Sequence, residues 1–324
     1  MRRAGDRLRV TAQLIEAQTG LNMWADRYDG AIEGIFEMQD RITESVVGVI
    51  EPEIRLAEIE HSRRERPDSI ASYDLYLRGL SEVNKESNEG LLASRDLFER
   101  ALALEPTSAL YMVYTAWTVR LGRAMGRLDE ETINDGRVQR LCHAAVAAAP
   151  NDGEVLARAG LTLAHQGRKY AMAEALVARA LETNPNSSVV RFCAGIVELH
   201  CGSLERSLVH LHRVLELSPR DPEAYRALTG LAHVLMVQGS FEAALHWAER
   251  SLTLNRNWTP TYWMLIAGNM LLGRTEAAAS YLELFRAVSP GTTVATIRDG
   301  QPAKYADRNQ HILEGLRQAG LPEA

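Results

Sequence analysis

Residues 188–219 read SVVRFCAGIVELHCGSLERSLVHLHRVLELSP and determine how the rest of the chain is interpreted. Two apolar runs of helical character flank a turn at Gly202, and Pro219 closes the second run. The first run carries a small residue, Gly195, and the second carries the bulky Leu211. Small residues let two helices approach closely, and proline lacks the backbone N–H that a continued helix needs. The segment therefore predicts a pair of packed helices, with Gly195 at a point of close approach.

The same pattern recurs along the chain, where prolines close similar runs at positions 106, 150, 185, 219 and 290. The second and third intervals are nearly equal, the first is somewhat longer, and the last is about twice as long. The last interval divides into two ordinary ones if Arg256 holds the place of a missing proline. Helical units with a period of about 34 residues stack on one another, because each pair can bury its apolar face only against the next pair.

Small and bulky residues keep the same phase ahead of each breaker. The positions equivalent to those of residues 188–219 are Ser94, Phe98 and Ala101, then Ala173, Val177 and Ala180, then Ala244, Ala248 and Ser251. The second repeat departs from the pattern, because a charged insertion at 127–137 precedes Val138, Cys142 and Ala145. This shared phase disfavours an alanine-rich bundle with chance prolines.

These positions resemble the tetratricopeptide repeat family. The resemblance implies a mostly α fold, a right-handed α-solenoid of about six helical hairpins over residues 70–300, followed by a capping helix in residues 301–324. In that family the first helices of successive repeats line a concave groove that receives an extended peptide or a helix. The equivalent groove residues here are Phe192, Ile196, His200, Arg226, His233, Trp263 and Met270.

Two points about this groove stay open in the sequence. Trp263 and Phe192 suit either the groove surface or the core between repeats, because helical phase alone does not separate the two. His165, His200 and His233 recur at a similar height of the groove, which would permit acidic or pH-dependent binding.

The amino-terminal segment, residues 1–60, follows a different pattern. Leu8, Val10, Ala12 and Leu14 alternate with residues of the opposite face, which predicts a strand, and residues 17–20 and 21–28 predict a turn and a returning strand. A helix is expected over 32–50. So small a unit leaves an open sheet edge, and we expect that edge to pair with a second copy or to dock on the first repeat.

Residues 1–60 are similar to the end of an α/β domain related to the amino-terminal domain of TolB. The similarity is carried by Gly5-Asp6, by the run WADRYD at 24–29 and by QDRI at 39–42. Such domains precede tetratricopeptide arrays in bacterial signalling proteins, behind a class III adenylate or guanylate cyclase or a winged-helix DNA-binding domain. Residues 61–69, HSRRERPDS, are expected to form a charged, exposed linker between this partial segment and the array.

The search for catalytic chemistry finds no phosphate-binding loop, no dinucleotide fingerprint, no nucleophile elbow and no H-E-x-x-H motif. His210 and His212 point about 200° apart on a helix, so they cannot share a metal ion. Cys193 and Cys201 are interpreted as small packing residues, and His200 as a surface or groove residue. We therefore expect no enzyme activity, no cofactor and no metal.

Composition and charge complete the expectation. The net charge of −6 does not indicate a nucleic-acid surface, and three scattered cysteines suit reduced thiols in a cytoplasm. No apolar run of about 18 residues predicts a membrane span, and the start MRRAGDRLRV predicts no signal peptide. The sequence thus predicts a cytoplasmic module that binds a protein or peptide in bacterial signalling. The alternative is the carboxy-terminal regulatory part of a cyclase or winged-helix regulator whose effector domain lies upstream of Met1.

Overall fold

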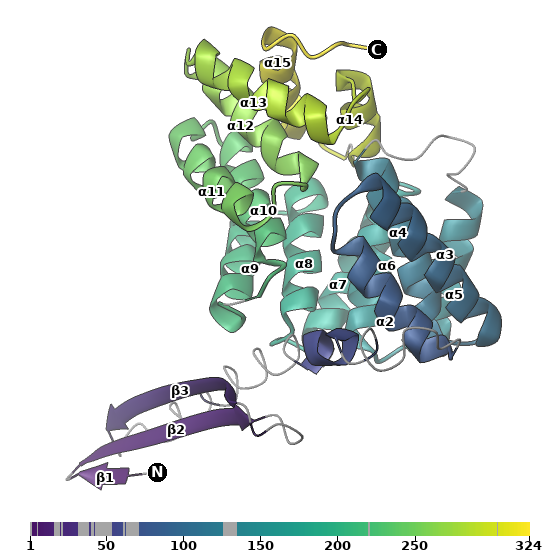
Figure 1. The fold of residues 1–324 in the computed structure, drawn as a ribbon, viewed down its shortest axis with the longest axis vertical. Helices are drawn as coiled ribbons and strands as arrows, with labels where there is room; N and C mark the ends of the chain where they lie inside the picture. Colours follow the sequence, from purple (N-terminus) through teal and green to yellow (C-terminus); the bar gives the residue numbers. More distant parts are fainter. Residues whose placement is uncertain are drawn as a thin grey trace.

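The computed structural model describes residues 2–4, 6–15, 20, 22–31, 39, 42, 54–60, 62, 71–125, 135–219, 221–302 and 304–324. Within this part of the chain, consecutive helices pack as six pairs that stack into a curved solenoid (Figure 1). The pairs are α2 (Ser72–Val83) with α3 (Asn88–Leu104), α4 (Ala109–Ala124) with α5 (Asp135–Ala148), α6 (Gly153–His165) with α7 (Tyr170–Thr183), α8 (Ser188–Cys201) with α9 (Leu204–Leu217), α10 (Ala224–Val237) with α11 (Phe241–Leu254), and α12 (Thr259–Leu271) with α13 (Thr275–Val288). The predicted α-solenoid is confirmed.

The expected breakers mark the ends of the second helices. Helices α3, α5, α7, α9 and α13 each end two residues before a predicted proline, and α11 ends two residues before Arg256. Several first helices begin at a side-chain cap, where Ser108, Asp152 and Ser187 accept a hydrogen bond from the backbone N–H three residues on. These caps satisfy N–H groups that the first turn of a helix leaves without partners.

The predicted contact positions lie in the core. Ser94, Ala173, Ser207, Ala244 and their bulky partners on the second helices are fully or almost fully buried. A Cβ atom added to Gly195 would lie 2.8 Å from the Leu211 side chain, and the Ser207 hydroxyl donates to the Gly195 carbonyl at 2.7 Å. The predicted close approach of α8 and α9 is confirmed.

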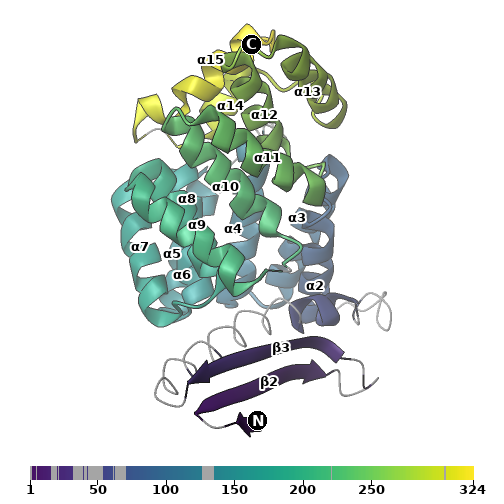
Figure 2. The same cartoon turned by 90° about the vertical axis from the view of Figure 1, so that its left-hand side faces the viewer.

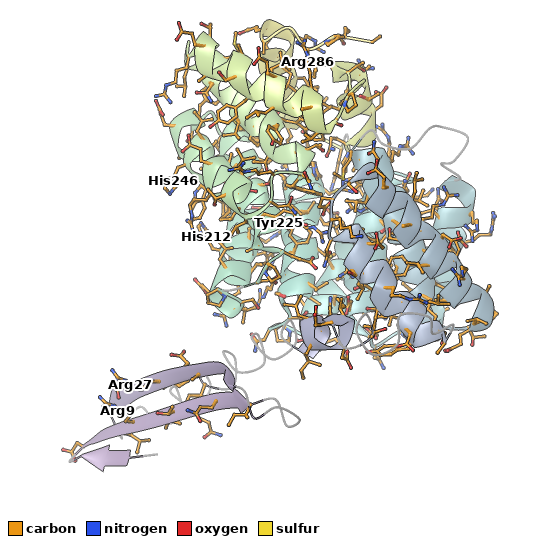
Figure 3. All side chains as sticks on the ribbon, viewed as in Figure 1. Arg9, Arg27, His212, Tyr225, His246 and Arg286 are labelled. Atoms are coloured by element: carbon orange, nitrogen blue, oxygen red, sulfur yellow. The ribbon has the colours of Figure 1, made fainter. Side chains whose placement is uncertain are left out.

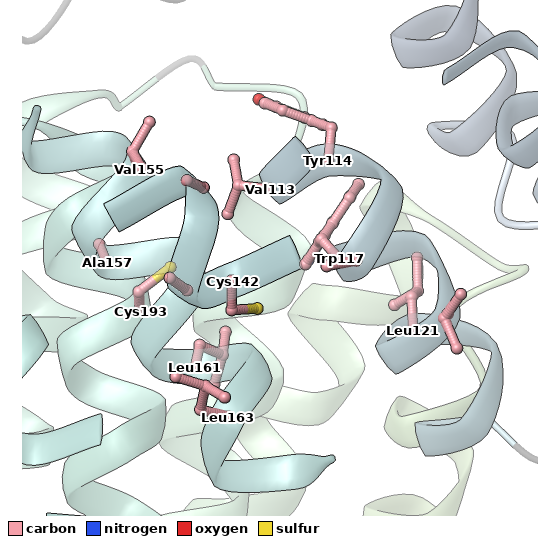
Figure 4. Close-up of a cluster of buried hydrophobic side chains, with 14 of the residues drawn as sticks. Val113, Tyr114, Trp117, Leu121, Cys142, Val155, Ala157, Leu161, Leu163 and Cys193 are labelled. Carbon is pink, nitrogen blue, oxygen red and sulfur yellow. The ribbon is translucent and has the colours of Figure 1, made fainter. Parts of the chain in front are cut away.

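The irregular second repeat also packs as expected. Val138, Cys142 and Ala145 of α5 are buried, whereas most of the charged insertion ahead of them lies outside the described residues. Figure 4 shows Cys142 and Cys193 among apolar side chains of the first helices, including Trp117 and Leu161. The phase of the repeat therefore survives the insertion.

The solenoid curves until its first turn meets its fifth repeat (Figure 2). Glu86, in the turn between α2 and α3, accepts hydrogen bonds from Tyr225 Oη at 2.7 Å and from Arg226 Nη2 at 2.6 Å. Asn257 adds a hydrogen bond to the Lys85 carbonyl at 3.1 Å. Glu86 has a φ of 51°, a left-handed conformation that costs an L-residue about 1–2 kcal/mol. This contact therefore holds together segments about 140 residues apart.

The carboxy-terminal segment runs along the first helices. Helix α14 (Val294–Gly300) contacts α4, and the 3₁₀ turn η2 (Ala306–Asn309) leads into α15 (Gln310–Gln318), which packs on α12 and reaches α10. Ile312, Leu313 and Leu316 of α15 are buried in one apolar cluster with side chains of α12 and α13. The expected terminal amphipathic helix is present, and it rests against the first helices of the last repeats.

Three strands form an antiparallel sheet at the amino terminus. They are β1 (Arg2–Ala4), β2 (Arg7–Ile15) and β3 (Asn22–Ala31), in the order β1-β2-β3. The two predicted strands are found, and β1 is an addition that pairs with the start of β2. Leu8 is buried while Arg9 and Thr11 are exposed, as the alternation predicts. Figure 3 shows Arg9 and Arg27 on this sheet and Tyr225 within the helical array.

The helix expected over 32–50 lies outside the described residues except at positions 39 and 42, which are helical. Pairing of a second copy with the sheet edge stays a prediction. No helix in the described ranges is long and apolar enough to cross a membrane.

Residues ahead of the predicted array make specific contacts with it. Arg55, in the helical stretch 54–60, pairs with Glu154 of α6 at 3.2 Å. Ser62 is buried and donates to Asp74 of α2 at 3.0 Å, so the prediction of an exposed linker is wrong at this residue. The rest of 61–69 lies outside the described residues. A boundary at residue 70 would cut these contacts, which no local charge pattern reveals.

Candidate functional site

The first helices of successive pairs face one another across the inside of the solenoid. Side chains from α4, α6, α8, α10 and α12, with Trp258 at the start of α12 and Gln301 after α14, enclose a hollow of about 590 Å³ that includes space open to solvent. We call this hollow the inner cavity. Its position follows from the repeat architecture, because each first helix presents its inward face at a similar height.

Six of the seven predicted groove residues lie on the wall of the inner cavity. They are Phe192, Ile196, His200, Arg226, His233 and Trp263, whereas Met270 is half-buried on α12 and does not line it. Trp263 is only 3% exposed, so it belongs to the core and to the cavity wall at once. Whether these residues bind a partner stays a prediction.

The three histidines expected at one height form a ladder. The ring centroids of His165 and His200 are 5.5 Å apart, those of His200 and His233 are 5.4 Å apart, and both contacts are edge to face. Burial lowers the pKa of all three, and that of His233 falls to about 4. The rings are therefore neutral at pH 7, and no cluster of ligands in the described residues is arranged for a metal ion.

Arg226 is occupied by the chain itself. Its side chain is 6% exposed, and its terminal nitrogens donate to Glu86 and to Glu223 at 2.6 Å each. Burial by itself would lower the pKa of Arg226, but Tyr225, Glu223 and Glu86 raise it well above its usual value. The sequence suggested Arg226 as a contact for a partner; it could not show that a distant turn would supply a carboxylate.

Arg158 is satisfied in a comparable way. It pairs with Glu154 at 2.8 Å, and its guanidinium lies 4.4 Å from the centroid of the Tyr114 ring. Glu154 also accepts from Tyr114 Oη at 2.7 Å. Burial would raise the pKa of Glu154, but Arg55, Arg158 and the Tyr114 hydroxyl lower it to about 2.

Arg120 is the residue that sequence reasoning missed. It is 7% exposed on α4, it lines the inner cavity, its Nε has no hydrogen-bond partner, and it forms no ion pair within the described residues. The one signal in the sequence is an arginine inside the apolar run YMVYTAWTVRLG, at 111–122. A charged residue at an inward position of a buried helix is uncommon unless it is paired.

The cysteines provide no reactive thiol at this site. Cys142, Cys193 and Cys201 are buried and free, and burial raises their pKa to about 12, 11 and 12 respectively. They are therefore protonated at pH 7. Because the thiolate is the nucleophilic form, none of these thiols is reactive at that pH.

Comparison with known proteins places the fold. No family model matches the chain. A putative adenylate cyclase 3 from Rhizobium meliloti (strain 1021) is 32% identical over 111 residues, a match that covers 34% of this chain and 19% of that protein. The chain thus matches only about a fifth of that relative's length.

Solved structures with similar folds are repeat solenoids. A tetratricopeptide repeat protein from Parabacteroides merdae ATCC 43184 superposes with a TM-score of 0.50 and 17% identity, covering 87% of this chain and 98% of that one. Human IFIT1, solved as a dimer with m7Gppp-AAAA, gives a TM-score of 0.58 and 14% identity over 78% of this chain and 60% of that chain. The chain therefore has a tetratricopeptide-like solenoid fold.

Proposed function

We propose that this chain is a protein interaction module of bacterial signal transduction that binds an amphipathic helix along the inner faces of α10 and α12. The observation that carries the proposal is α15, because the chain's own helix already rests on this surface. A Cβ atom added to Gly315 would lie 2.5 Å from the Ala267 Cα atom, so the two helices are in close contact. His311 Nδ1 also lies 2.9 Å from the Met236 carbonyl oxygen.

The chemistry of α15 defines the kind of partner. Ile312, Leu313 and Leu316 are buried on α12, while Glu314 and Gln318 face solvent. A partner helix with the same apolar spacing would take the place of α15. Helices bind grooves in this way through apolar anchors three or four residues apart.

The test uses a fluorescent peptide of residues 304–324 added to the full chain. In the Gly315→Leu variant the chain's own α15 cannot sit against Ala267, so the peptide is expected to bind at least tenfold more tightly than to the natural chain, measured by fluorescence anisotropy. Glu314→Ala, on the exposed face of α15, is the matched control and should leave the affinity unchanged. A folded Gly315→Leu variant, shown by its circular dichroism melting curve, that fails to bind the peptide would refute the helix-binding role.

The partial match to the putative adenylate cyclase favours a second candidate. In this alternative the solenoid is the carboxy-terminal regulatory part of a class III cyclase. The resemblance to bacterial signalling proteins also allows a winged-helix regulator as the full-length protein. Sequencing the genomic DNA upstream of the Met1 codon decides between these. An in-frame cyclase or winged-helix domain would support the alternative. An unrelated or out-of-frame gene would support the first proposal, an independent interaction module.

A further inference from the structure

The inner cavity contains a buried positive charge that forms no ion pair with the described residues. Arg120 projects from α4 among the lining side chains, and no ion pair to it is found in the described part of the chain. Burial lowers its pKa to about 10, so the guanidinium is still charged at pH 7. A buried charge without a partner destabilises the fold, because its interaction with water is lost and not replaced. Such a group is therefore a strong indication of a missing counter-charge.

Other donors around Arg120 are also without acceptors. The indole Nε1 atoms of Trp258 and Trp263 and the Nδ1 atom of His200 are buried and have no hydrogen-bond partner. All three residues line the inner cavity. Buried polar atoms are nearly always hydrogen-bonded, and an indole N–H can only donate, so the two tryptophans indicate that something with acceptor oxygens belongs there.

Burial lowers the pKa of Arg120 and the charge of Glu86 acts to raise it, but no carboxylate in the described part of the chain forms an ion pair with Arg120. Among the described residues that line the inner cavity there is no aspartate or glutamate. A neighbouring hollow shares Arg120, Phe192, Arg226 and Trp258 with it and also contains Arg158, Asp221 and Glu223. There the arginines other than Arg120 meet carboxylates of the chain. Of the described arginines that line the two hollows, Arg120 is thus the one without an ion pair.

Much of the remaining wall is apolar. Leu161, Phe192 and Ile196 belong to this apolar part of the lining. A ligand with a charged end and a compact apolar body matches this division of the wall.

We propose that the inner cavity binds a small organic oxyanion, a phosphate or a carboxylate on an apolar body, with its charged group held by Arg120 and the indole N–H groups of Trp258 and Trp263. Guanidinium and oxyanion groups form short, charge-assisted hydrogen bonds that are about twice as strong as neutral ones. This function is separate from the helix-binding surface on α12, because the ligand lies within the solenoid and needs no protein partner.

The test compares three probes of similar size on the full chain by isothermal titration calorimetry. Phenyl phosphate and benzoate carry the two candidate charged groups, and benzamide is their neutral counterpart. The natural chain should bind at least one of the anions at a single saturable site and should not bind benzamide. Preference for either anion supports the proposal and identifies the charged group.

Two variants locate the site. Arg120→Met should weaken anion binding at least tenfold, whereas Arg100→Met, which removes an exposed arginine of α3, should leave binding unchanged. Without ligand, Arg120→Met should melt no lower than the natural chain, because it removes a charge that nothing stabilises. Absence of saturable binding of both anions, equal binding by Arg120→Met, or a lowered melting temperature of the ligand-free variant would each overturn the proposal.

Discussion

Three arginines on the inner face differ only in their surroundings. Arg158 and Arg226 are held by carboxylates, and Arg120 is not. Glu154 and Glu223 stand four and three residues before Arg158 and Arg226, whereas Arg120 has no carboxylate within four residues of it. The second carboxylate on Arg226, that of Glu86, comes from the first repeat, and this part of the charge balance is a property of the folded chain.

His233 allows a prediction about pH. Its pKa is about 4 in the folded chain, where burial is the main cause, and about 6.5 in an unfolded chain. The unfolded state therefore takes up a proton first as the pH falls. The contribution of His233 to the free energy of unfolding is constant above pH 6.5 and decreases as the pH falls towards 4. The contribution of this residue amounts to at most about 3 kcal/mol.

The measurement is urea unfolding at pH 7, 5 and 4 for the natural chain and for His233→Gln. The variant should lose less stability on acidification than the natural chain. Taking the difference between the two proteins removes the effect of Asp221, whose pKa is raised to about 6 by burial and which acts in the opposite direction. Parallel curves for the two proteins would show that His233 is not the titrating group.

Pairs of helices are held together by positions that the repeat pattern reveals. Gly195 on α8 faces Leu211 on α9, Gly160 on α6 makes a similar contact with α7, and Gly268 on α12 meets Leu245 of the preceding pair. The small residue at this position lets the helix axes approach, and the opposite bulky residue fills the space. The same regularity is the reason why the pairing could be predicted before the structure was known.

Replacement of Gly195 tests this packing. In Gly195→Leu the new side chain would meet Leu211 well inside contact distance, and overpacking of this kind costs roughly 1–3 kcal/mol. The free energy of unfolding in urea should fall by that amount. Val209→Leu, at a site on α9 that is 64% exposed, is the control and should change stability by less than about 0.5 kcal/mol. An unchanged midpoint for Gly195→Leu would mean that α8 and α9 are in a different register.

A contact between the first and fifth repeats closes part of the solenoid. Glu86 joins the first repeat to Tyr225 and Arg226 of the fifth, and its side chain is 1% exposed. Simple nearest-neighbour stacking would leave these repeats independent. We therefore expect the closure to make the array more cooperative than stacking alone would.

Glu86→Gln tests the closure. The substitution leaves Arg226 with Glu223 alone, and breaking one side of a buried pair typically costs about 3–5 kcal/mol. We expect a loss near the lower limit, with faster hydrogen exchange in the turn between α2 and α3. Arg274→Gln, which removes an exposed pair with Glu242, is the control, and pairs of that kind contribute about 0–1 kcal/mol. Equal losses of unfolding free energy for the two variants would indicate that the contact does not hold the first and fifth repeats together.

The sequence by itself determined the repeat, its phase and its breakers. Pro219 and Gly195 act on neighbouring turns and helices, and such local effects follow from the backbone chemistry of proline and the size of glycine. It also predicted that Phe192, Ile196 and His200 lie on the inner face, because their positions in the repeat recur on successive first helices. These features depend on residues a few turns apart.

Only the tertiary structure decided what the inner face contains. The curvature of six stacked pairs brings Glu86 to Arg226, sets α15 on α12 and leaves Arg120 without a counter-charge. Small rotations between repeats accumulate along a solenoid, so contacts between distant repeats depend on the sum of many interfaces. No local pattern encodes that sum, and the unbalanced charge in the inner cavity is therefore visible only in the folded chain.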